Sequence, residues 1–118
     1  MSIAFEVADE TVWFPALRIG KIYAGYVGVL ERVLGRPAGV TMGTDDTVRI
    51  DPRLFVPFVD GLLDAYASSN HPVLHEQLVL VIKLSLVMLE RAGTSWQPDD
   101  PRLEPVKDYR DVGRSMPV

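Results

Sequence analysis

VLHEQLVLVIKLSLVMLER, residues 73–91, is apolar in almost every direction around a helix. At about 100° per residue, three of its charged side chains, Glu76, Lys83 and Glu90, fall on one narrow stripe, because they lie seven positions apart. A stripe that thin does not make an ordinary solvent-facing side. The run therefore predicts a helix that is either the centre of a small domain or half of an interface with another chain.

A transmembrane span is the other interpretation of this run. Its most apolar part, residues 78–89, is shorter than the roughly 18 residues that a span needs, and it contains Lys83 and Ser85. We therefore expect no insertion into a membrane. The chain also begins without the basic and then apolar segments of a signal peptide, and this start predicts a cytoplasmic protein.

Composition limits the size and the class of the protein. A chain of 118 residues, 47% hydrophobic and 24% charged, fits one globular domain with one core. The net charge of −4, with twelve scattered basic residues, argues against nucleic acid as a partner. The absence of cysteine excludes disulfides and thiolate metal sites, and no motif in the chain calls for a cofactor.

The remaining sequence predicts short strands and two further helices. Alternating and β-favouring residues predict strands at 3–7 and 11–14, and a second hairpin at 40–42 and 47–50 with turn residues between. Helical spacing predicts helices at 16–34 and 52–66, the first ended by Gly35 and the second opened by Asp51 and Pro52. We expect an α+β fold in which a small antiparallel sheet of about four short strands packs against three helices, the last one long and central.

The C-terminal residues have a different character. Residues 94–118 carry several prolines among charged residues, which makes them a poor candidate for regular structure. The prediction is a single domain at 1–93 followed by a proline-rich irregular arm or tail at 94–118.

Small residues recur along the first predicted helix. Ala16, Gly20, Ala24 and Gly28 are four positions apart and so form one row on its surface. Glycine within a helix costs about 0.5–1 kcal/mol relative to alanine, so this row needs an offsetting gain. We interpret it as a groove that receives the helix at 73–91. The alternative is that the glycines admit a backbone or a ligand.

The best candidate for chemistry is the segment around two histidines. His71 and His75 are spaced so that they can point to one side of a helix, and Glu76 adds an oxygen ligand, so a metal or ligand site is conceivable. The zinc-protease motif, however, needs glutamate directly after the first histidine, where this chain has Pro72. We therefore favour helix capping and surface packing for the histidines, and we predict no metal.

Paired carboxylates are the other chemical signal. Asp60 and Asp64 lie one helical turn apart on the side opposite the apolar residues of their helix, and Asp45 and Asp46 occupy a hairpin turn. Both pairs are typical of solvated positions rather than of an enclosed acid and base. There is no nucleophile motif and no phosphate-binding glycine loop, so no catalytic residue is assigned.

Several local strings carry a resemblance to a known family. They are residues 12–15 (VWFP), 50–52 (IDP), 58–60 (FVD), 69–74 (SNHPVL) and 89–93 (LERAG). Together they resemble a family of small uncharacterised proteins from actinomycetes over residues 3 to 93. The resemblance implies a stand-alone cytoplasmic α+β domain of unknown function, with no activity or site to carry over.

These features favour a non-catalytic interaction protein. The helix at 73–91 carries more apolar surface than the predicted elements can cover, so we expect it to pair with a second copy or with another protein. Small size and acidic charge would suit an immunity or antitoxin-like inhibitor. The alternative is a small ligand-binding or metal-dependent enzyme domain near His71, His75 and Glu76. The predicted interface residues are Glu76, Val79, Leu80, Lys83, Val87 and Glu90.

Overall fold

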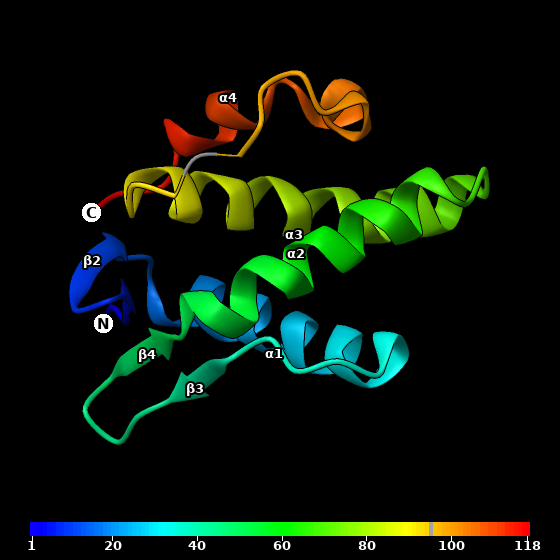
Figure 1. The fold of residues 1–118 in the computed structure, drawn as a ribbon. Coiled ribbons are helices and arrows are strands. Elements are labelled where there is room, and N and C mark those ends of the chain that lie inside the picture. The colour runs from blue at the N-terminus through cyan, green and yellow to red at the C-terminus, as the bar shows by residue number, and fades with distance from the viewer. Residues whose placement is uncertain (95) are drawn as a thin grey trace.

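The computed structural model describes residues 1–94 and 96–118, and it confirms the α+β class. Figure 1 shows the elements. Their order and bounds are β1 (Ala4–Val7), β2 (Glu10–Trp13), α1 (Leu17–Leu34), β3 (Val40–Met42), β4 (Thr47–Ile50), α2 (Pro52–Ala67), α3 (Pro72–Arg91), the 3-10 helix η1 (Pro101–Val106) and α4 (Tyr109–Gly113).

The four strands form one mixed sheet in the order β2-β1-β4-β3. The two predicted hairpins are present as antiparallel pairs, β1 with β2 and β3 with β4. The central pair, β1 with β4, is parallel, so the expectation of a purely antiparallel sheet is wrong at this pair. Turn residues fix the pairing within each hairpin, but α1 connects the two hairpins and its path decides how they meet.

Local chemistry sets the helix ends. The Asp51 side chain accepts a hydrogen bond from the Arg53 backbone N–H at 3.0 Å, and Pro52 opens α2. His71 caps α3 in the same way through Nδ1, which accepts from the Val73 N–H at 3.2 Å. Gly35 closes α1 with a left-handed φ of 66°. The predicted bounds of the three long helices hold to within a residue or so.

The long helix α3 is central, as expected. In Figure 1 the C-terminal arm (residues 96–118) lies along one side of α3, and α2 lies along the other. By length and composition α3 could cross a membrane, yet half of its apolar window is buried inside the fold. That burial is typical of the core helix of a globule, and the compact chain is consistent with a soluble protein.

The C-terminal arm packs on the domain and contains two short helical pieces, η1 and α4, so the described residues form five helices rather than three. The Asp100 side chain accepts from the Arg102 N–H at 2.9 Å and Pro101 begins η1, a cap that proline content alone conceals. Four apolar side chains of the arm join the core and are at most 8% exposed: Leu103, Val106, Tyr109 and Met116.

Candidate functional site

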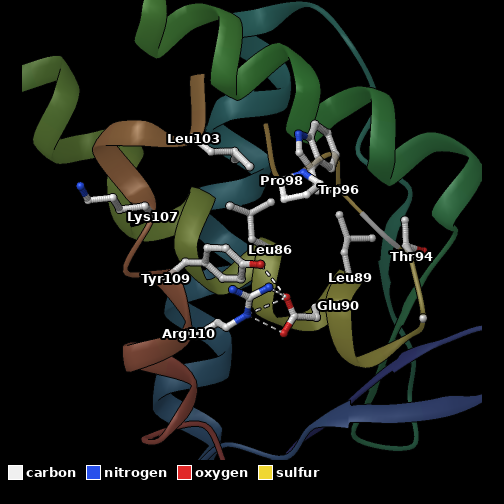
Figure 2. Close-up of a pocket in the computed structure, with 11 residues that line it drawn as sticks. Leu86, Leu89, Glu90, Thr94, Trp96, Pro98, Leu103, Lys107, Tyr109 and Arg110 are labelled. Carbon is white, nitrogen blue, oxygen red and sulfur yellow. Dashed lines mark hydrogen bonds and ion pairs between the residues drawn. The ribbon is translucent and has the colours of Figure 1, made fainter. Parts of the chain in front are cut away.

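The arm is clamped to the C-terminal half of α3 by a carboxylate. Glu90 accepts hydrogen bonds from the Tyr109 hydroxyl at 2.5 Å and from Arg110 Nε at 3.0 Å, as Figure 2 shows. The hydrogen bond from Arg110, and then that from Tyr109, lowers the pKa of Glu90, whereas burial raises the pKa of Tyr109. The carboxylate is thus held charged and the phenol protonated, which suits a fixed contact rather than proton transfer.

A hollow of about 460 Å³ lies beside this clamp, between α3 and the arm. Its apolar walls include Leu86, Leu89 and Leu103, and Figure 2 shows Trp96 beside Pro98 on the same side. The charged groups on its rim are already engaged, Glu90 by the clamp and Lys107 by Glu104 at 2.7 Å. Among the described residues that line it, the hollow therefore has apolar surface but no free group that could do acid–base chemistry.

The arm also covers the predicted interface on α3. Lys83 pairs with Asp108 at 3.0 Å. Val87 is only 5% exposed, and a Cβ built on Gly113 would lie 3.4 Å from its side chain. Lys83, Val87 and Glu90 therefore face the arm of the same chain. Of the other predicted interface residues, Glu76 is exposed, Val79 is half-buried and Leu80 is 50% exposed.

The histidines serve the connection between α2 and α3. His71 Nδ1 is the cap acceptor described above. His75 Nε2 lies 3.0 Å from the Tyr66 carbonyl oxygen and 2.5 Å from that of Ser69, so it carries a proton and donates to them. The His75 ring also stacks on Tyr66 at 3.9 Å. Glu76 is exposed beside them, and no group of three metal-ligand side chains gathers within residues 1–94 and 96–118.

The row of small residues on α1 meets different neighbours along its length. A Cβ built on Gly20 would collide with Ile3 of the segment leading into β1, whereas one built on Gly28 would meet nothing within 4 Å. Ala16 is exposed and Ala24 is half-buried. Gly20 thus leaves room for side chains of the N-terminal segment, above all that of Ile3, rather than for α3 or for a backbone.

Among the described residues, α1 carries five of the exposed large apolar side chains. Its buried residues are Gly20, Tyr23, Val27 and Leu30. The next row along the helix is also apolar and has the same spacing, but it is open to solvent. We call this row the α1 stripe. Its members, each between 44% and 72% exposed, are Ile19, Ile22, Tyr26, Val29 and Val33.

A hollow of about 260 Å³ lies where the α1 stripe meets α3, and both helices line it. Figure 1 shows the two helices running in opposite directions. Leu80 and Leu84 contribute the α3 wall, and the Tyr23 hydroxyl lies 2.7 Å from Ser85 Oγ across the helix pair. Burial raises the pKa of Tyr23, so its hydroxyl stays neutral. Among the described residues, Trp13 Nε1 in the wall is the one buried side-chain N or O atom without a partner.

A basic row runs along the edge of the α1 stripe. Arg18, Lys21 and Arg32 are exposed and precede the stripe residues Ile19, Ile22 and Val33 by one position. Within residues 1–94 and 96–118, these three are the only ones of the twelve Lys and Arg side chains without a hydrogen bond or ion pair. The nine engaged ones are Arg36, Arg49, Arg53, Lys83, Arg91, Arg102, Lys107, Arg110 and Arg114.

Comparison with known proteins gives a family and no function. A model described as a family of unknown function matches residues 1–118. No curated protein and no solved structure matches the chain. The match confirms the expected family of unknown function, whereas an actinomycete origin stays a prediction.

Proposed function

The chain belongs to that family, DUF6086, which brings no activity with it, and from the geometry we propose that the protein is a non-catalytic interaction module. It binds another protein through the α1 stripe and the neighbouring Leu80 of α3. The observation that carries the proposal is the open face of α1, where five large apolar side chains in alternating three- and four-residue spacing remain in contact with solvent.

The size of this face supports a partner. Five stripe residues and Leu80, each roughly half exposed, present on the order of 500 Å² of apolar surface, which is at the upper end of what a monomer carries without a binding role. A standard interface buries about 800 Å² on each side. The stripe with its charged edge is therefore large enough to form the centre of one.

This proposal moves the interface from α3 to α1. The sequence placed it on residues 73–91, but the arm occupies Lys83, Val87 and Glu90 within the chain, and Leu80 is what remains. An enzymatic site near His71, His75 and Glu76 has no comparable support, because one ring nitrogen of each histidine already serves a local backbone contact and no group of three metal-ligand side chains gathers among the described residues.

An immunity or antitoxin-like inhibitor is the finer form of this proposal. Such an inhibitor needs little more than a small stable domain with one binding surface. A chain of 118 residues with a net charge of −4 is compatible with this role. A toxin gene beside the gene for this chain would name the partner. Action in the cytoplasm belongs to the same proposal.

Site-specific photocrosslinking in the source cell tests the interaction. A photoreactive residue in place of Val29 should give one crosslinked species of defined mass, and a further Ile22→Asp change should abolish it. Met42 on β3 is the matched control position, since its 46% exposure is close to the 47% of Val29. Equal labelling at the two positions, or labelling at neither, would refute the proposed function.

A further inference from the structure

We infer that the partner presents an amphipathic helix with acidic side chains along one flank, and that this helix lies along α1 with its apolar side on the α1 stripe. The inference rests on the proposed function and adds the chemistry of the partner. It draws on three properties of the α1 face, namely the spacing of its apolar residues, the room beside them and the charge of its edge.

Spacing and shape favour a helix as the occupant. Positions 19, 22, 26, 29 and 33 alternate in steps of three and four. Apolar residues with this spacing pack against a second helix that carries apolar residues with the same spacing. Leu80 and Leu84 of α3 rise on one side of the stripe, so the hollow between them and Ile22 receives side chains from above. This arrangement is a helix-in-groove site rather than a flat one.

The row beside the stripe leaves room for close approach. Gly25 and Gly28 lie in the basic row, and a Cβ built on either would meet nothing within 4 Å. Each glycine costs α1 about 0.5–1 kcal/mol of helix stability, and no contact within the described chain compensates for it. A partner backbone near these positions would supply the missing contact.

The charge of the edge favours carboxylates on the partner. Arg18, Lys21 and Arg32 have no carboxylate within ion-pair distance in the described chain, although other basic side chains of the chain do. Exposed ion pairs are each worth little, but three of them in one row select which helix binds and in which register. A neutral or basic flank would leave the row unpaired.

A second copy of the chain is the less suitable occupant. When two α1 helices pack antiparallel about a twofold axis, each edge meets the same edge of the other copy. Arg18, Lys21 and Arg32 of the two chains would then face one another without an acidic residue of the row between them. Such like-charge juxtaposition disfavours the pair.

A membrane surface is also less suitable. A basic edge beside an apolar stripe is a feature of interfacial helices, but the chain as a whole carries −4 and would be repelled by anionic lipid. The stripe is also partly walled by Leu80 and Leu84, and a bilayer cannot follow a hollow of this kind.

Synthetic peptides provide the test with the full chain. One helical peptide carries leucines in alternating three- and four-residue spacing with glutamates on the flanks, and its counterparts carry glutamine or lysine there. Fluorescence anisotropy should show the glutamate peptide binding roughly tenfold more tightly than the lysine peptide, because three modest ion pairs are gained. High salt should reduce the difference. The double variant Arg18→Glu, Arg32→Glu should reverse the preference, and the control Lys107→Glu should leave it unchanged.

The outcomes separate this inference from the proposed function. Equal binding of all three peptides, lost in Val29→Asp, would overturn the acidic flank and leave the interaction function standing. A crosslinked partner without binding of any peptide would overturn the helix. Binding of wild type to phosphatidylserine vesicles that Arg18→Glu, Arg32→Glu removes would assign the face to a membrane instead. A dimer in light scattering that Val29→Asp dissociates would assign it to a second copy.

Discussion

The same substitution at two glycines of α1 should have opposite effects on stability. Gly20 and Gly28 lie in one helix, eight positions apart. Alanine is the better helix former by about 0.5–1 kcal/mol at an interior position. The surroundings therefore decide the sign of the change at each site.

At Gly20 the added methyl group has no space. It would overlap with Ile3 Cγ2 and lie 3.1 Å from Phe5 Cε1 and 3.2 Å from Pro15 Cγ. Ile3 is β-branched and 1% exposed, so it cannot swing aside. Overpacking of this kind costs about 1–3 kcal/mol. The overlap with a buried β-branched side chain favours the upper part of that range, about 2–3 kcal/mol, so after subtraction of the gain in helix propensity Gly20→Ala should lower the free energy of unfolding by about 1–2.5 kcal/mol.

At Gly28 the methyl group enters open space, so Gly28→Ala should raise the free energy of unfolding by about 0.5–1 kcal/mol. Urea unfolding followed by far-UV circular dichroism measures the free energy of unfolding of both variants. An unchanged m value shows that the differences between them are differences in stability. A Gly20→Ala protein as stable as wild type would refute the packing of α1 on the N-terminal strand. If a partner helix approaches this row, Gly28→Ala should also weaken binding while it stabilises the fold.

Two further predictions concern the core and the arm. Tyr23→Phe should cost about 1 kcal/mol because it leaves the buried Ser85 hydroxyl unpaired; in a urea double-mutant cycle, Tyr23→Phe with Ser85→Ala should cost less than the sum of the single changes, and strict additivity would contradict the contact. Hydrogen bonds from Arg102 hold the pKa of Asp100 at about 2, below its usual 3.8, so the contribution of this contact to the free energy of unfolding is complete above about pH 4 and disappears as the pH falls toward 2. Arg102→Met should therefore lower the free energy of unfolding by about 1–2 kcal/mol at pH 7 and flatten its decline over that pH range. An unchanged acid profile would contradict the arm contact.

Much of the fold could be predicted because local chemistry sets it. Asp51 with Pro52, and His71 with Pro72, mark the starts of α2 and α3 through caps that depend on a few neighbouring atoms. The turn residues of the two hairpins have the same local character. The stripe of Glu76, Lys83 and Glu90 was also read correctly as one side of α3. The arm, rather than solvent, contacts Lys83 and Glu90 at the C-terminal part of this stripe.

Long-range pairing was beyond the sequence. The parallel contact of β1 with β4 depends on the path of α1, which no turn motif specifies. The cover over Val87 comes from a segment that looked irregular because prolines hide its helical turns, and Arg91 fastens that segment by donating to the Gly113 and Met116 carbonyls. A residue outside any periodic pattern or motif can still belong to the core when its segment packs on a helix that is distant in the sequence.

The exposed face of α1 could not be identified from the sequence for a related reason. Two rows of α1, one led by Tyr23 and the other by Ile22, share helical spacing and apolar character, and periodicity could not tell which row is buried. The signal available in the sequence was the number of apolar rows. A helix that buries one side needs only one apolar row, and α1 has two.

The open row has a physical consequence for function. Val33 is 72% exposed, so a polar side chain there would cost the fold little while improving solubility. The apolar side chain at this stripe position is therefore not required by the monomer. The adjoining row shows the same imbalance, because its arginines and lysine lack partners among the described residues and its glycines weaken the helix. Contact with an acidic-flanked helix would satisfy both rows at once, and this joint requirement is why the two rows argue for one partner.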